Sequence, residues 1–163
     1  MIKVWKIIAA NRKENEMTIE TFKATSKMVE GLQVDNMVRD FVLRMDEPEN
    51  LGGTDTGMNP VEALLCALGS CQVIVAGAFA KSKGIDLQDF WLELEGDLDP
   101  DGFLKGKTGV RMGFQEVRVT PHIKTTSSPE KVAAFMEFIA QRCPVEDVMI
   151  NGTKIIASEA VFE

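Results

Sequence analysis

Three cysteines, at positions 66, 71 and 143, are the residues of this 163-residue chain with the clearest capacity for chemistry. A thiolate is a nucleophile, so each cysteine could attack an electrophile, and two of them could form a disulfide. Cys66 and Cys71 lie roughly 140° apart around a helix, so we expect that they do not pair with each other. We interpret Cys66 as a small buried hydrophobic residue, the usual role of a lone helical cysteine.

Cys71 and Cys143 each have two interpretations. Gly69 and Ser70 precede Cys71 and leave room beside its sulfur, so Cys71 is either a reactive thiol or another small core residue. Pro144 follows Cys143 and can begin a helical turn. In that case Cys143 is the N-cap, where free N–H groups and the helix dipole lower the pKa of a thiol. Otherwise Cys143 ends the preceding helix and packs on a sheet.

The segment that contains Cys71 is predicted to be a long helix over about residues 60–83. Asn59 can cap the helix, Pro60 suits its first position, and Glu62 completes a capping box. Gly84, preceded by two nearby lysines, is typical of a helix end. Apolar residues surround the helix instead of forming one stripe, so we expect it to be buried on all sides.

The same apolar run, from Ala63 to Ala80, is long enough to raise the alternative of a membrane span. Ser70, Gln72 and the many Ala and Gly residues argue against that alternative, as does the lack of aromatic belts. We therefore predict a core helix and no membrane association.

The rest of the chain predicts an α+β fold with antiparallel strands in a single domain over residues 1–163. Met37–Met45 is the clearest predicted strand, because its apolar residues alternate. The predicted segments, in chain order, are N-terminal strands over about residues 1–46, a Gly-rich loop over 47–58, the central helix over about 60–83, and strands with a second helix over 88–163, ending in a strand from Thr153 to Phe162.

Composition excludes several classes of function. A net charge of −7 argues against nucleic-acid binding, which needs clustered Lys and Arg. The single histidine and the lack of a Cys-x-x-Cys motif give no support for a metal site, and we predict no cofactor. An odd number of cysteines fits a reducing compartment, and no signal peptide is recognised, so we expect a cytoplasmic protein.

From about residue 17 to its C-terminus, the chain resembles the OsmC/Ohr family of osmotically inducible and organic-hydroperoxide-resistance proteins. Within that family it is most similar to the general OsmC-like branch. The matching motifs, in order, are Asp46-Glu47-Pro48, Leu51-Gly52-Gly53, Asn59-Pro60-x-Glu62-x-Leu64-Leu65, Leu68-Gly69-Ser70-Cys71 and Cys143-Pro144-Val145.

The resemblance implies an intertwined homodimer, with an antiparallel sheet around a long buried central helix and a second helix. It implies that Cys71 is a peroxidatic thiolate, which attacks the O–O bond of a small organic hydroperoxide and becomes a sulfenic acid. Cys143 would then resolve this acid to a Cys71–Cys143 disulfide, which an external dithiol reduces. Such a protein is an antioxidant thiol peroxidase.

Two features depart from the peroxidase branches. Those branches carry a carboxylate directly after Asn-Pro, where this chain has Val61, with Glu62 one position later. They also use an early arginine to stabilise the thiolate, whereas residues 25–28 contain Lys27 and no arginine. Glu62 and Arg39, the nearest early arginine on a predicted strand, are therefore the candidate supporting residues. The alternatives are a non-peroxidatic protein that binds a small apolar ligand at the dimer interface, or a thiol redox regulator.

Overall fold

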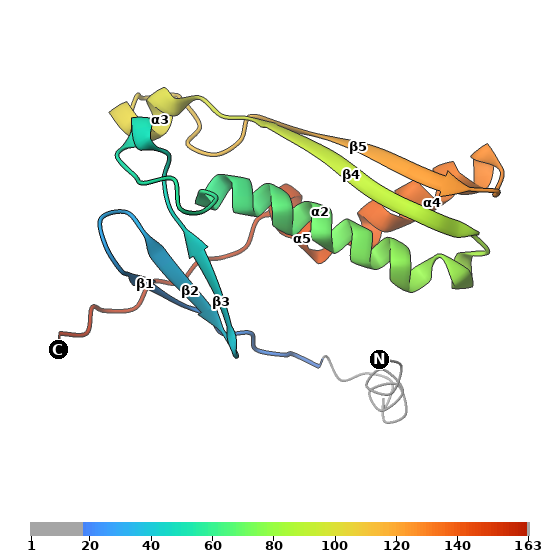
Figure 1. Cartoon of the computed structure of the whole chain (residues 1–163), viewed down its shortest axis with the longest axis horizontal. Coiled ribbons are helices and arrows are strands. Elements are labelled where there is room, and N and C mark those ends of the chain that lie inside the picture. Colours follow the sequence, from blue (N-terminus) through green and yellow to red (C-terminus); the bar gives the residue numbers. More distant parts are fainter. Residues whose placement is uncertain (1–17, 163) are drawn as a thin grey trace. The chain divides into compact units, whose positions relative to one another are not determined.

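The computed structural model describes residues 18–162 and confirms the predicted α+β class, with antiparallel strands and several helices (Figure 1). The chain divides into two compact units, Met1–Gly57 and Met58–Glu163. The part of the N-terminal strand region that falls within residues 1–17 lies outside the described residues. The single domain proposed for residues 1–163 stays a prediction.

The first unit contains a three-stranded antiparallel sheet in the order β1-β2-β3. The predicted strand Met37–Met45 is wrong in one respect, because Arg39 and Asp40 form a tight turn inside it. Arg39 adopts φ 55°, as hairpin turns of this kind require, and period-2 alternation does not distinguish such a hairpin from one continuous strand. The elements of this unit are β1 (Thr25–Met28), β2 (Val34–Val38), β3 (Phe41–Met45) and the 3₁₀ turn η2 (Glu49–Leu51).

The Gly-rich loop after β3 is organised around the buried carboxylate of Asp46. This carboxylate accepts hydrogen bonds from the backbone N–H and hydroxyl groups of Thr54 and Thr56, at 2.7 to 3.2 Å. These bonds, the Thr54 hydroxyl first, hold the pKa of Asp46 well below its usual range. Only glycine fits at position 53 of this loop, because an added Cβ would lie 1.8 Å from the carbonyl oxygen of Glu47.

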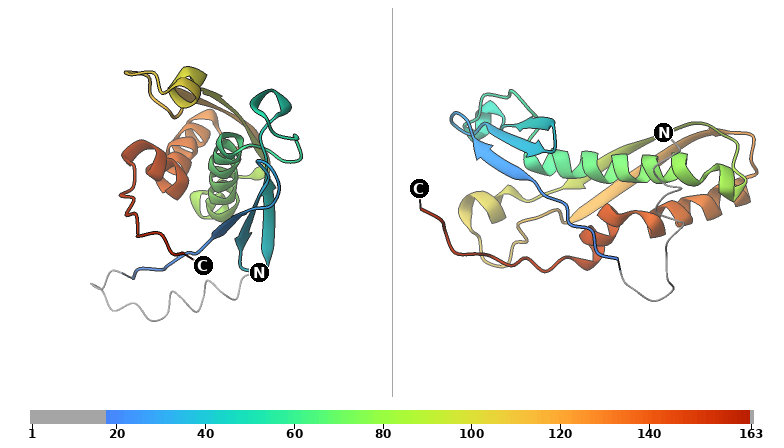
Figure 2. Two further views of the ribbon diagram at one scale, coloured as in Figure 1. Left: turned by 90° about the vertical axis from the view of Figure 1, so that its left-hand side faces the viewer. Right: turned by 90° about the horizontal axis from the view of Figure 1, so that it is seen from below.

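The second unit packs helices against a two-stranded antiparallel ribbon. Helix α2 lies along β4, and α4 and α5 contact α2 (Figure 2). Its core gathers apolar side chains from α2, α4 and the segment before β4, including Val75, Ile85, Phe135 and Ile139. The elements are α2 (Pro60–Phe79), the 3₁₀ turn η3 (Lys81–Lys83), β4 (Leu87–Asp97), α3 (Pro100–Lys105), β5 (Glu116–Thr125), α4 (Pro129–Arg142) and α5 (Pro144–Asn151).

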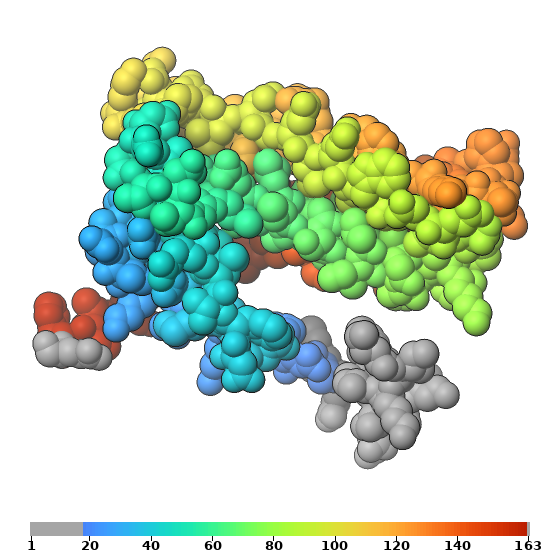
Figure 3. Space-filling view, viewed as in Figure 1, coloured from blue at the N-terminus to red at the C-terminus, as the bar shows by residue number. Residues whose placement is uncertain are grey.

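Helix α2 begins as predicted, because Asn59 and Glu62 form a reciprocal capping box before Pro60. The expectation of burial on all sides is wrong for this chain. Only one side of α2 is covered, and Ile74 on the other side is 69% exposed. In Figure 3 a broad part of the green α2 surface lies open below β4. The reason is that a two-stranded ribbon and two helices cannot surround a helix of 20 residues.

Among the described residues, α2 is the one helix whose length and composition would allow it to cross a membrane. The core helix of a globular protein passes the same test, and 28% of the tested stretch of α2 is buried, on its covered side. Ala76 is completely buried, and Gly69 lies so close to β4 that an added Cβ would be 2.8 Å from Cδ1 of Leu94. These contacts support the predicted core role.

The strand predicted from Thr153 to Phe162 is not formed in the described chain. The segment leaves its apolar side chains in solvent, with Ile155 91% exposed and Val161 87% exposed. A strand needs a neighbour that satisfies its backbone N–H and C=O groups, and β-branched residues alone do not supply one.

Candidate functional site

The fold brings together the two cysteines that are far apart in sequence. Cys71 of α2 is in hydrogen-bond contact with Cys143, which stands between α4 and α5. Cys143 is 2% exposed and Cys71 is partly exposed, and both are free thiols. Cys66 was expected to be buried, but it is exposed, because it lies on the uncovered side of α2.

The predicted N-cap position of Cys143 is confirmed, and the same residue also ends the preceding helix. Helix α4 ends at Arg142, Cys143 is its C-cap, and the same residue is the N-cap of α5, which Pro144 begins. The Cys143 Sγ accepts a hydrogen bond from the backbone N–H of Glu146 at 3.4 Å. The chain therefore turns sharply at this thiol and directs it toward α2.

The predicted lowering of the Cys143 pKa is wrong. Burial, followed by the hydrogen bond with Cys71, raises the pKa of Cys143 to about 11. The Glu146 N–H acts in the opposite direction, but it is outweighed because a buried thiolate loses its hydration. Cys143 therefore keeps its proton at neutral pH.

This shift predicts a pH dependence of stability for the reduced protein. The folded state holds the Cys143 proton up to about pH 11, whereas the ordinary pKa is 9.0. Between these values the folded state binds more protons than the unfolded chain, so its free energy of unfolding should fall as pH rises, by at most about 1.4 kcal/mol per pH unit. Urea denaturation across this window measures the slope. Cys143→Ala should flatten it, and an unchanged slope would contradict the assignment.

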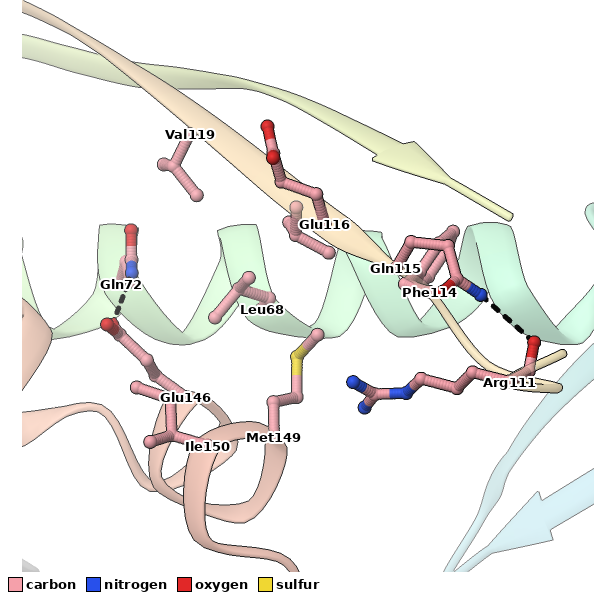
Figure 4. Close-up of a pocket in the computed structure, with 11 residues that line it drawn as sticks. Leu68, Gln72, Arg111, Phe114, Gln115, Glu116, Val119, Glu146, Met149 and Ile150 are labelled. Atoms are coloured by element: carbon pink, nitrogen blue, oxygen red, sulfur yellow. Dashed lines mark hydrogen bonds between the residues drawn. The ribbon is translucent and has the colours of Figure 1, made fainter. Parts of the chain in front are cut away.

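A polar pair that sequence reasoning missed lies beside the thiols, with Gln72 buried and Glu146 half-buried. Gln72, which follows Cys71, donates from Nε2 to Oε2 of Glu146 at 2.7 Å (Figure 4). The one available signal was that Gln72 is a long polar side chain inside an otherwise apolar helix. A buried amide needs a partner, but the sequence does not say which residue provides it.

Two cavities flank this pair, and Gln72 and Glu146 contribute to the walls of both. The larger is about 280 Å³ and lies between α2, α5 and the segment that leads into β5. The smaller is about 190 Å³ and is lined by β4, β5 and α4. In Figure 4 the Arg111 guanidinium points toward Met149 at the edge of the larger cavity, whose other walls include Leu68, Phe114, Val117, Val119 and Ile150.

A third, more open groove of about 560 Å³ runs between α2 and β4 on the exposed side. Its walls are mainly apolar and include Cys66, Val73, Ile74, Trp91 and Leu94. A groove of this size and polarity suits a small apolar molecule or a second protein surface.

The single histidine, His122, does not assemble a metal site. Its ring stacks on Trp91 with centroids 4.7 Å apart, and its Nε2 lies 3.2 Å from Oε2 of Glu93. Within residues 18–162, His, Cys, Asp and Glu form no group of three or more that could hold a metal ion.

Glu62, one of the two candidate supporting residues, lies away from the thiol pair along α2. The Glu62 carboxylate accepts the N–H of Asn59 at 2.8 Å, and nine residues separate Glu62 from Cys71, about 14 Å along a helix. Arg39 belongs to the first unit, where its guanidinium lies 5.2 Å from the centroid of the Phe41 ring. Their supporting roles stay predictions.

Comparison with known proteins gives consistent matches. The family model described as OsmC-like protein matches residues 53–158. The hydroperoxide reductase of Mycoplasma genitalium is 27% identical over 100 residues, which are 60% of this chain and 64% of that protein. The match therefore spans less than two thirds of that relative's length.

Solved structures share the fold. An OsmC-like protein from Mycoplasma pneumoniae has a TM-score of 0.72 at 20% identity, with 84% of this chain and 94% of that chain covered. An organic hydroperoxide resistance protein OsmC from Legionella pneumophila has a TM-score of 0.62 at 18% identity, with 83% and 93% covered. At these identities the likeness shows the α+β fold alone.

Proposed function

Because the chain belongs to the OsmC-like protein family, we propose that it reduces organic hydroperoxides with Cys71 and Cys143 as a thiol pair. The observation that supports this most is the contact between these thiols, which come from opposite ends of the second unit's sequence. The name of the Mycoplasma genitalium relative, hydroperoxide reductase, supports the same reaction class.

In the first step, the Cys71 sulfur attacks the terminal oxygen of the hydroperoxide. An S–O bond forms, the O–O bond breaks, and the alkoxide that leaves takes a proton and becomes an alcohol. Cys71 is then a sulfenic acid. Cys143 stays a neutral thiol at this stage because of its raised pKa, so its S–H can donate a hydrogen bond to the Cys71 sulfur.

In the second step, the Cys143 sulfur attacks the sulfur of the Cys71 sulfenic acid. The S–S bond forms, the S–O bond breaks, and the hydroxide that leaves takes the Cys143 proton and becomes water. An external dithiol then reduces the disulfide through a mixed disulfide and is itself oxidised.

We also propose that the working protein is a cytoplasmic homodimer. The apolar side of α2 is exposed and an open groove lies beside β4, which supports the proposal that a second copy of the chain packs over both. Glu62 and Arg39 remain the proposed supporting residues, and the dimer could bring either of them to a Cys71 of the other subunit.

The test is to mix the reduced protein with cumene hydroperoxide and count free thiols and cumyl alcohol. We expect each chain to lose both Cys71 and Cys143 thiols and to produce one equivalent of alcohol. Slow oxidation by the hydroperoxide, together with fast exchange with a dithiol, would favour a thiol redox regulator instead. No oxidation of either thiol would rule the proposal out.

A second candidate function is the binding of a small apolar ligand without peroxide chemistry. The observation in its favour is the open groove of about 560 Å³ beside the exposed face of α2. Native mass spectrometry of the freshly purified protein should then show a bound small molecule. Rapid peroxide turnover by ligand-free protein would count against this function.

A further inference from the structure

Cys71 lies on α2 and Cys143 caps α5, and a partly buried side-chain hydrogen bond joins these two helices close to the thiols. Gln72 follows Cys71 on α2, and its amide donates to the carboxylate of Glu146 on α5 at 2.7 Å. The backbone N–H of the same Glu146 donates to the Cys143 Sγ at 3.4 Å. We call the Gln72–Glu146 hydrogen bond the bridge.

Because few other contacts fix α5, the bridge is a main constraint on its position. No residue of α5 itself is fully buried, so apolar packing fixes the position of this helix weakly. Cavities of about 280 and 190 Å³ lie on the two sides of the bridge, so few neighbouring atoms constrain it. Gln72 is only 7% exposed, and its amide would be unsatisfied if the bond to Glu146 were lost.

We propose that Gln72 and Glu146 are positioning residues that hold α5 against α2, so that Cys143 can reach the oxidised sulfur of Cys71. The two side chains are bonded to each other and join α5 to α2, so we assign the bridge to the second step, in which Cys143 must reach Cys71, and not to the first. This role in the catalytic cycle rests on the proposed function, whereas its role in pairing the two thiols does not.

Disulfide formation requires the two sulfurs to close from hydrogen-bond contact to about 2.0 Å. The cavities beside the bridge leave room for α5 to make this small movement. The bridge keeps the movement directed, because it ties α5 to the residue beside Cys71. Without it, α5 should sample positions in which Cys143 is out of reach.

Loss of the bridge therefore predicts a longer-lived Cys71 sulfenic acid. In Gln72→Ala, the Cys71 sulfur should still attack the hydroperoxide at the wild-type rate. Attack by Cys143 should be at least about tenfold slower, because misplacement of a reacting group is costly. The waiting sulfenic acid can meet a second hydroperoxide molecule, which oxidises it to a sulfinic acid and is itself reduced to an alcohol.

The experiment uses the reduced full-length protein and two readouts. Rapid quenching after cumene hydroperoxide, followed by mass spectrometry, measures the Cys71 sulfenic acid, the disulfide and the sulfinic acid. Equilibration with reduced and oxidised dithiothreitol measures the stability of the Cys71–Cys143 disulfide without any peroxide. The variants are Gln72→Ala and Glu146→Ala, and Gln141→Ala, on the exposed face of α4, is the matched control.

The double variant Gln72→Glu/Glu146→Gln restores a bridge with donor and acceptor exchanged. We expect it to recover most of the disulfide rate and stability that the single variants lose, which a general loss of folding would not allow. The proposal is overturned if Gln72→Ala forms the disulfide as fast and as stably as the wild type, or if the exchanged pair gives no recovery. If the hydroperoxide oxidises Cys71 neither in the wild type nor in any variant, the proposed function fails. The equilibrium with dithiothreitol then still tests the role of the bridge.

Discussion

Cys71→Ser is expected to reduce the consumption of cumene hydroperoxide to the background rate. Serine keeps the size and polarity of the side chain, but its hydroxyl is not ionised at neutral pH and does not attack the O–O bond as a thiolate does. The measurement is the release of cumyl alcohol in the presence of dithiothreitol, with free thiols counted in parallel. Circular dichroism would show whether the variant keeps the fold.

Cys143→Ser separates the two steps. We expect this variant to carry out the first oxidation and to release about one equivalent of alcohol per chain, because Cys71 is intact. No intramolecular disulfide can then form, and Cys71 should be trapped as a sulfenic acid that reacts with dimedone.

Cys66→Ser is the matched control for both substitutions, because Cys66 is exposed and stands apart from the contact between Cys71 and Cys143. It should consume hydroperoxide at the wild-type rate and form the same disulfide. Equal losses of activity in the Cys66 and Cys71 variants would contradict the assignment of Cys71 as the nucleophile.

Phe135→Ala is expected to lower the free energy of unfolding by about 3–5 kcal/mol. Phe135 is 2% exposed and belongs to the core formed with Val75, Ala76 and Ile139. Truncation removes apolar contacts and leaves a cavity that rigid helices cannot fully close. Urea denaturation of the reduced protein measures the difference.

Phe103→Ala provides the matched control, because the same side chain is removed where it is 67% exposed. We expect its effect on the free energy of unfolding to stay within about 0.5 kcal/mol. If the two substitutions cost the same, the apolar cluster around Phe135 does not form the core of this unit.

The Phe135 substitution also bears on the site, because α4 runs directly from this core to Cys143. A displaced α4 would move the point at which α5 begins. The Cys71–Cys143 disulfide of Phe135→Ala should therefore be more easily reduced by dithiothreitol than that of Phe103→Ala.

Local features of the structure could be predicted because their causes are local. The capping box of Asn59 and Glu62 and the helix from Pro60 are set by residues within one turn of each other. The N-cap position of Cys143 follows in the same way from Pro144. The motifs also pointed to the OsmC-like family, which the match over residues 53–158 shows.

Other predictions were wrong where the outcome depended on distant partners. The expected lowering of the Cys143 pKa considered only its helix N-terminus, whereas burial against α2 outweighs that effect. The exposed side of α2 and the unformed strand after Thr153 have the same origin. In both segments the residue pattern is suited to burial or strand pairing. Burial and pairing also need a second surface or strand, which the described chain does not provide.

The sequence by itself determined which helix carries Cys71, where that helix begins and which residue caps α5, because hydrogen bonds within a turn decide these points. Only the tertiary structure decided that Cys71 meets Cys143 and that Gln72 binds Glu146. Those contacts join segments about 70 residues apart, and their geometry comes from the packing of α2, α4 and α5 as rigid bodies.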